Sequence, residues 1–270
     1  MRLRFALAAC ALLLALACST SPLGRKQLTL VPDMQMNAMG LSAFEQMKTE
    51  VPVEKDPAIN AYVRCVAEAV LAVCADQTGV ADWEVVVFKD DTANAFALPG
   101  GRIGVHTGLL KVAKTPDQLA AVIGHEIAHV IARHGNERVS QGMVAELGLG
   151  VIDVMVGDPQ SQEHQQMMGL LGLGTQVGIL LPFSRGHESE ADLLGLDAMA
   201  QAGFDPRAAV DLWQNMSAAG GGQPPEFLST HPSHATRIGD LEARMASAQA
   251  LQAQARAAGR KPNCKAPAGR

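Results

Sequence analysis

The chain has 270 residues, of which 48% are hydrophobic and 18% charged, and its formal net charge is -5. This composition is too apolar for a disordered chain, and the length allows one good-sized core. The slight excess of acids gives no electrostatic basis for binding nucleic acid. Aromatic residues are scarce at 4%, while alanine, leucine, glycine and methionine are plentiful, a balance that favours helices.

The first residues have the pattern of an export signal. Arg2 and Arg4 precede an unbroken apolar run over 5–17, which is too short for a membrane span. We therefore predict a signal peptide over 1–17 and an exported protein.

The end of this signal, residues 15–18 (Ala-Leu-Ala-Cys), resembles a bacterial lipobox. The resemblance implies that Cys18 is lipidated and becomes the mature N-terminus. Because Ser19 follows, where aspartate would imply retention at the inner membrane, it further implies a lipid anchor in the outer membrane of a Gram-negative bacterium, facing the periplasm. The anchor would then be the chain's only membrane contact, and 19–32 a linker. The alternative is an ordinary cleaved signal with an incidental cysteine.

Export permits a disulfide among Cys65, Cys74 and Cys264. Cys65 and Cys74 fall on one predicted helix about 13.5 Å apart, beyond the ~7 Å Cα limit for a bridge. We expect Cys264 to pair with one of them, and the sequence leaves open which.

Apolar spacing and turn residues predict the elements in chain order. Helices are expected over 33–50 and 57–75. A strand at 83–88 and a hairpin of strands 95–98 and 102–106 around Pro99-Gly100-Gly101 predict a small, about three-stranded sheet. The fold class is therefore α+β and mainly helical.

The next helix is marked by a capping Thr115, a proline at its first position and an acid in its first turn. It continues through His125, and Gly135 offers a stop or a kink just after His134. The glycine-dotted region 142–182 is read as buried helix or a mobile cover near the active site, in preference to membrane contact.

Three further helices are expected before a loose tail. The first starts near Ser184 and ends at Gly203, the second starts at Asp205-Pro206, and the third starts at Ser233. A flexible loop is expected over 220–225, between the second and the third. The tail is 259–270, and no internal repeat stands out.

Residues 125–129 (His-Glu-Ile-Ala-His) carry the chemistry. Side chains four apart share a helix face, so His125 and His129 can bind one zinc ion while Glu126 holds the metal-bound water as general base. Apolar neighbours indicate burial, and two histidines and a glutamate are costly to bury without a partner. The helix is thus of the HExxH zincin type, with one zinc expected per chain.

The third ligand must come from elsewhere. A histidine six residues after His129 would fall at position 135, which is glycine, and His134 is read as a helix-end residue. On the helix from Ser184, Glu188 and Asp192 share a face, so Glu188 can bind zinc while Asp192 accepts the free N–H of a ligating histidine. Glu190 is the competing ligand.

Four segments together resemble peptidases of family M48, and the similarity covers about residues 25–245. They are 94–101 (Asn-Ala-Phe-Ala-Leu-Pro-Gly-Gly), 125–129, 184–192 (Ser-Arg-Gly-His-Glu-Ser-Glu-Ala-Asp), and 229–233 with Arg237. The resemblance, to the bacterial lipoprotein branch, implies a peptidase domain over 33–258. It also implies periplasmic protein quality control, with polypeptide substrates and outer-membrane protein assembly as the possible partner machinery.

The same resemblance implies two catalytic assignments. His231 matches a loop histidine that can occupy the open position of the zinc, and Arg237 an arginine placed to stabilise the oxyanion. We expect substrate to lie along the strand Asn94, Ala95, Phe96 and Ala97 by β-addition. The predicted function is a zinc endopeptidase for misfolded envelope proteins. The alternative is a zinc protein latched by His231 that acts mainly as a periplasmic chaperone.

Overall fold

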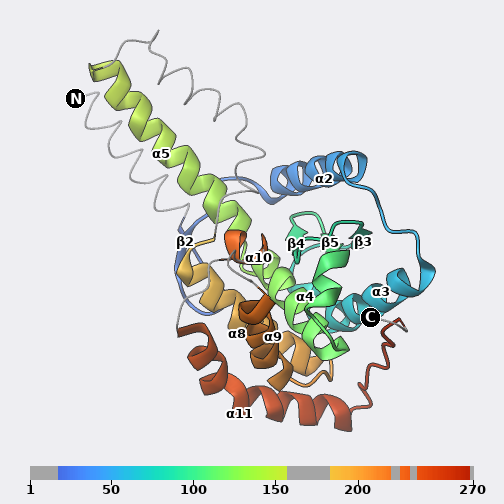
Figure 1. Cartoon of the computed structure of the whole chain (residues 1–270). Helices are drawn as coiled ribbons and strands as arrows, with labels where there is room; N and C mark the ends of the chain where they lie inside the picture. The colour runs from blue at the N-terminus through green and yellow to red at the C-terminus, as the bar shows by residue number, and fades with distance from the viewer. Residues whose placement is uncertain (1–17, 157–182, 220–225, 232–235, 268–270) are drawn as a thin grey trace. The chain divides into compact units, whose positions relative to one another are not determined.

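The computed structural model describes residues 18–156, 183–219, 226–231 and 236–267 (Figure 1). The described chain forms two compact units. The first contains residues 18–36 and 133–156, and the second contains 37–132 and the described residues from 183 onward.

The first unit contains a hairpin where the sequence predicted a linker. Strand β1 (Cys18–Thr20) pairs antiparallel with β2 (Lys26–Leu28), and helix α5 (His134–Val156) lies in the same unit. Arg25 donates to both carboxylate oxygens of Glu137 on α5, at 2.8 and 2.7 Å. The amide of Asn136 bonds both the N–H and the C=O of Val31. These contacts attach residues 25–31 to α5, and their partners lie more than 100 positions away in the sequence.

The break between α4 (Pro116–Ile131) and α5 differs from the prediction. Helix α4 ends at Ile131, Arg133 adopts a left-handed conformation with φ of 57°, and α5 starts at His134. The expectation that His134 would end the motif helix is wrong, since it is buried in the first turn of the next one. Arginine is not a residue that favours positive φ, and Gly135, which offered a stop or a kink, lies two positions after this break.

The second unit contains the predicted three-stranded sheet. Its strands are β3 (Glu84–Phe88), β4 (Ala95–Leu98) and β5 (Arg102–His106), in the order β3-β5-β4. β3 runs parallel to β5, and β4 is joined antiparallel to β5 through a turn in which Gly100 and Gly101 have φ of 84° and 78°. β4 therefore lies at one edge of the sheet.

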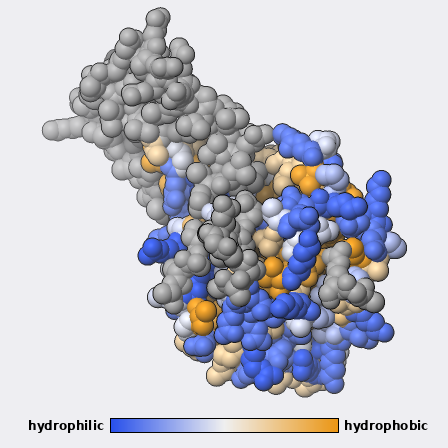
Figure 2. All heavy atoms as spheres, viewed as in Figure 1, coloured by the Kyte–Doolittle hydropathy of each residue, from blue (hydrophilic) through white to orange (hydrophobic). Residues whose placement is uncertain are grey.

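Helices make up most of the second unit (Figure 1). Besides α4 they are α2 (Asp33–Glu50, whose first residues belong to the first unit), α3 (Pro57–Cys74), α8 (Arg185–Gln201), α9 (Arg207–Ala219), α10 (Glu226–Thr230) and α11 (Thr236–Ala257). Two short 3₁₀ helices, η1 (Ala75–Gln77) and η2 (Thr107–Lys111), follow α3 and β5. The mainly helical α+β class is confirmed. The surface over α11 is mostly hydrophilic (Figure 2).

Helix α3 is a core helix. By length and composition alone, Pro57–Gln77 is apolar enough to cross a membrane. Its buried residues, including Val63, Val66 and Val70, instead join the hydrophobic core, and α3 packs against α4, α8 and β3. The region predicted as buried helix or cover is α5 up to residue 156, and 157–182 lie outside the described residues.

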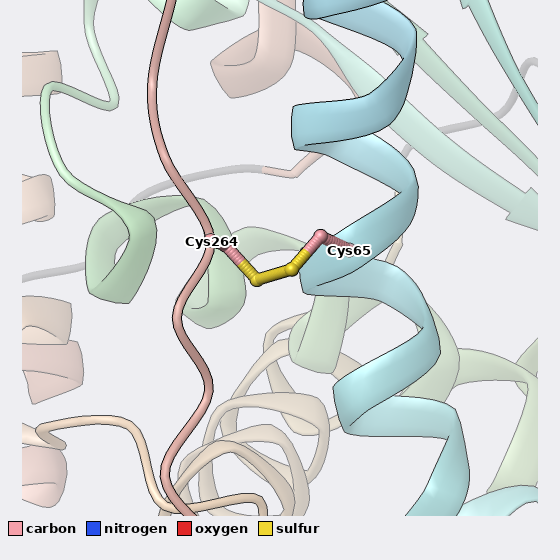
Figure 3. Close-up of a disulfide and its surroundings, with 2 residues drawn as sticks. All are labelled: Cys65 and Cys264. Carbon is pink, nitrogen blue, oxygen red and sulfur yellow. A yellow bond between two sulfur atoms is a disulfide. The ribbon is translucent and has the colours of Figure 1, made fainter.

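One disulfide connects α3 to the C-terminal segment. Cys65 is bonded to Cys264 with a Cα–Cα distance of 5.6 Å (Figure 3), which confirms that Cys264 pairs with a cysteine of this helix. Cys74 is a buried thiol that donates to the Val70 carbonyl, and burial raises its pKa to about 12. Residues 259–267 contain no helix or strand, and the bond to Cys65 holds them to the second unit.

Candidate metal centre

Helix α4 presents the two histidines of the motif on one face. The hydroxyl of Thr115 caps the helix by accepting the N–H of Gln118 at 3.1 Å, as its sequence predicts. One turn separates His125 from His129, and their Nε2 atoms lie 3.1 Å apart. Both side chains are buried.

Helix α8 supplies a carboxylate to the same point. Ser184 caps α8 in a reciprocal arrangement with His187, which fixes the start of the helix. Glu188 then lies in the first turn with no exposed surface. Its Oε2 is 3.5 Å from His125 Nε2, and its Oε1 is 3.6 Å from His129 Nε2. Glu190 is buried but lies outside this cluster.

Two glycines set the distance between these helices. A Cβ at Gly195 of α8 would lie 2.6 Å from the backbone nitrogen of His125, and a Cβ at Gly124 would lie 2.8 Å from the Gly195 carbonyl oxygen. Side chains at either position would separate α4 from α8. The glycine pair therefore allows Glu188 to reach the two histidines.

His231, directly after α10, is the fourth member of the cluster. Its Nδ1 lies 3.2 Å from His125 Nε2 and 3.1 Å from Glu188 Oε1, and its Nε2 is 3.5 Å from Glu126 Oε1. Among the described residues, this is the one group of three or more potential metal ligands, and its four ligand atoms lie within 4.8 Å of one another.

The spacing of these atoms fits a metal ion. In a tetrahedral site with bonds of 2.0–2.1 Å, neighbouring donor atoms are about 3.3 Å apart. Five pairs of nitrogen and oxygen atoms in this cluster are separated by 3.1–3.6 Å, and all four ligand atoms lie within 4.8 Å of one another. Three imidazoles and a carboxylate buried together therefore form a donor set that can hold one divalent cation.

A second layer of charged groups surrounds the cluster. His125 Nδ1 lies 3.0 Å from Asp192 Oδ1, as predicted for a histidine whose other nitrogen faces a metal. Arg237 donates to both oxygens of Asp192 at 2.6 Å, and its second terminal nitrogen is 2.7 Å from Glu188 Oε2. The arginine expected at the oxyanion thus contacts two carboxylates, and only 1% of it is exposed.

The charges of the cluster depend on one another. Burial alone would lower the pKa of His125, but hydrogen bonds to Asp192 and Glu188 outweigh it and raise that pKa to about 9. Burial alone would raise the pKa of Glu188, but hydrogen bonds from His125 and His231 outweigh it and bring that pKa far below its usual range. Burial likewise opposes ionisation of Asp192, and the charge of Arg237 keeps its pKa low. In the metal-free cluster, the two carboxylates therefore favour the protonated form of His125.

Glu126 faces the edge strand. Burial raises its pKa, and the nearby backbone N–H of Ala97 on β4 acts in the opposite direction. The N–H of His106 on β5 donates to the carbonyl of Asn94, so alternate residues Ala95 and Ala97 direct their backbone groups to the open edge of β4. The side-chain oxygen of Asn94 is buried without a partner among the described residues. The predicted substrate strand and the candidate base are thus brought together.

Aromatic side chains near the cluster were missed in the sequence. The ring of Phe183 stacks on His129 at 3.8 Å between centroids, and Phe227 stacks on His231 at 4.4 Å. Trp213 lies under the guanidinium of Arg237 at 3.8 Å. The chain has only ten aromatic residues. The positions of two of them, just before Ser184 and shortly before His231, were the available signals that aromatic rings pack on the cluster.

Known proteins resemble this chain over most of its length. It is 38% identical over 218 residues to the mitochondrial metalloendopeptidase OMA1 of Schizosaccharomyces pombe, covering 78% of this chain and 61% of that protein. It is 32% identical over 226 residues to the β-barrel assembly-enhancing protease of Yersinia pestis, covering 80% of this chain and 45% of that protein. For the protein of that name in Escherichia coli K12, the identity is 28% over 215 residues, covering 76% and 43%.

The chain spans 43–61% of the length of these three relatives. A model of the family described as Peptidase family M48 matches residues 57–245, which include every member of the candidate metal centre. Because this match covers well over half of the 270 residues, the chain belongs to peptidase family M48.

Proposed function

We propose that this protein is a zinc-dependent endopeptidase. The observation that carries the proposal is the buried cluster of His125, His129 and Glu188, with Glu126 beside it and close to the edge strand. Two histidines and one glutamate are the ligand set of known catalytic zinc sites. When bound, zinc would polarise the scissile carbonyl and lower the pKa of a bound water.

Glu126 is proposed as the general base. Its raised pKa brings it closer to neutral pH, where proton transfer in both directions is most effective. The carboxylate lies beside the cluster and near the Ala97 N–H, where it can take a proton from water and return it to the leaving amine. An extended peptide would pair with the open edge of β4, where Ala95 offers its backbone N–H and C=O and Asn94 and Phe96 flank it.

The contacts of Arg237 support a role other than stabilising the oxyanion. Because its guanidinium is bonded to Asp192 and lies against Glu188, we propose that it orients these two carboxylates. His231 lies at the fourth position of the cluster, so its imidazole must withdraw before a substrate carbonyl can enter. The oxyanion partner would then be His231 in its withdrawn position or the zinc itself.

Metal binding should be strongly pH-dependent. In the metal-free protein, the raised pKa of His125 contributes stability that is fully present below pH 6.5 and lost as pH rises through about 9. A ligating imidazole must be neutral, so zinc displaces this proton. We expect release of about one proton per zinc at pH 7, and an affinity that rises about tenfold per pH unit up to about 9. Calorimetry in buffers of different ionisation enthalpy measures this release, and zinc binding without proton release would contradict it.

The substrates and location are also proposals. Two of the three relatives described above carry the name β-barrel assembly-enhancing protease. Together with the lipobox-like sequence before Cys18, this supports a lipoprotein anchored in the outer membrane that degrades misfolded envelope proteins in the periplasm. The mitochondrial relatives show that the family is not confined to that compartment.

A second candidate function is that of a chaperone whose zinc site stays closed. The position of His231 within the cluster favours it, because this imidazole fills the place that a substrate would need. The variant Glu126→Gln separates the two functions. An endopeptidase loses cleavage while keeping the metal, whereas a chaperone shows no cleavage before or after the substitution and protects unfolded proteins equally in both forms.

A further inference from the structure

Arg237 connects one candidate zinc ligand with the partner of another. It lies 2.7 Å from Glu188, and it donates two hydrogen bonds to Asp192, which in turn faces the Nδ1 of His125. A tilt of the guanidinium would therefore displace Glu188 and His125 together. An arginine side chain has several rotatable bonds, so something must fix the plane of its guanidinium.

Trp213 of α9 provides a surface for that plane. The guanidinium carbon lies 3.8 Å from the centre of the indole ring. Trp213 is 7% exposed and Arg237 1%, so this cation–π contact is shielded from water, the condition under which it is strongest. The carboxylates hold the guanidinium at its edge and the indole holds its face.

The helix that carries Trp213 borders a small cavity next to the metal centre. Helix α11, which carries Arg237, packs against both α8 and α9. A narrow cavity runs between these helices and reaches both His125 and Asp192, with Trp213, Leu241 and apolar side chains among its lining residues. A smaller side chain at position 213 would enlarge this space, into which the guanidinium could tilt.

We infer that Trp213 is a positioning residue of the metal centre, which acts through Arg237 on Glu188 and Asp192. This inference rests on the proposed function, since it assumes that the cluster holds zinc. No motif of the sequence marks Trp213. If Trp213 were only a core residue, replacing it would lower the stability of the fold and leave the metal site unchanged.

The test compares three variants of the full chain. Trp213→Leu keeps an apolar side chain but removes the ring face, Trp213→Phe keeps a weaker face, and Met216→Ala removes a buried side chain of the same helix. Each is measured for zinc affinity by competition with a chromophoric chelator, for the visible spectrum of its Co²⁺ form, and for Tm.

We expect Trp213→Leu to bind zinc about 10-fold more weakly, as when outer partners of metal ligands are lost, and to shift the Co²⁺ bands. Trp213→Phe should lie between it and the wild type. Met216→Ala should lower Tm with unchanged zinc affinity. If Trp213→Leu does not fold, a weaker zinc affinity of Trp213→Phe than of Met216→Ala supports the inference.

A Trp213 variant with lowered Tm but wild-type zinc affinity and Co²⁺ spectrum would overturn the positioning role alone, and the proposed peptidase would stand. A wild-type chain that binds neither zinc nor Co²⁺ would overturn both.

Discussion

Replacing Glu126 with glutamine should lower kcat for peptide cleavage by about 10²–10⁴-fold while zinc remains bound. Glutamine has the shape of glutamate and fills the same buried space, so the site should keep its geometry. It cannot take a proton from water, so hydrolysis loses its base. The measurement is hydrolysis of a quenched fluorescent peptide or casein, together with the zinc content of the same preparation.

The matched control is Asp117→Asn, which makes the same carboxylate-to-amide change on the same helix. Asp117 lies in the first turn of α4 and accepts the Asp205 N–H, a bond that an asparagine oxygen can also accept. This variant should cleave like the wild type. If Glu126→Gln retained more than a small fraction of wild-type turnover in a clean preparation, Glu126 would not be the base.

Adding one methyl group at Gly195 should damage the metal centre without touching any ligand. The new Cβ would lie 2.6 Å from the backbone nitrogen of His125 and 2.8 Å from the carbonyl carbon of Gly124. These are backbone atoms, so α4 and α8 must move apart, at a cost of about 1–3 kcal/mol for overpacking. The movement also separates Glu188 from the histidines. We expect a lower urea midpoint and weaker zinc binding for Gly195→Ala.

Gly239→Ala is the control with the opposite expected sign. Gly239 lies in α11, and no atom comes within 4 Å of a Cβ built there. Alanine in a helix interior is favoured over glycine by about 0.5–1 kcal/mol, so this variant should be slightly more stable and bind zinc normally. A Gly195→Ala protein with wild-type stability and zinc affinity would show that the close helix crossing is not required.

Much of the fold could be predicted because its signals are local. The cap at Thr115, the turn at Pro99-Gly100-Gly101 and the four-residue spacing of His125 and His129 each lie within a few residues of what they determine. Helix geometry excluded a bond between Cys65 and Cys74 and left Cys264 to pair with one of them. The choice of Cys65 depends on how the tail packs.

Features that depend on distant partners could not be predicted. Residues 19–32 read as a linker because nothing local shows that Arg25 will meet Glu137. Arg237 was expected to stabilise the oxyanion, and nothing local shows that its partner is Asp192, 45 positions away. The left-handed Arg133 had no sequence signal, since packing overrides the preference of arginine for negative φ.

The zinc content of the purified wild type and of Glu188→Gln tests the central claim most directly. We predict close to one zinc per wild-type chain. For Glu188→Gln, the loss of affinity should exceed the 10–100-fold typical of residues that only support a ligand. The claim would be contradicted by a wild-type protein that holds no divalent metal, or by a Glu188→Gln protein that binds zinc as tightly as the wild type.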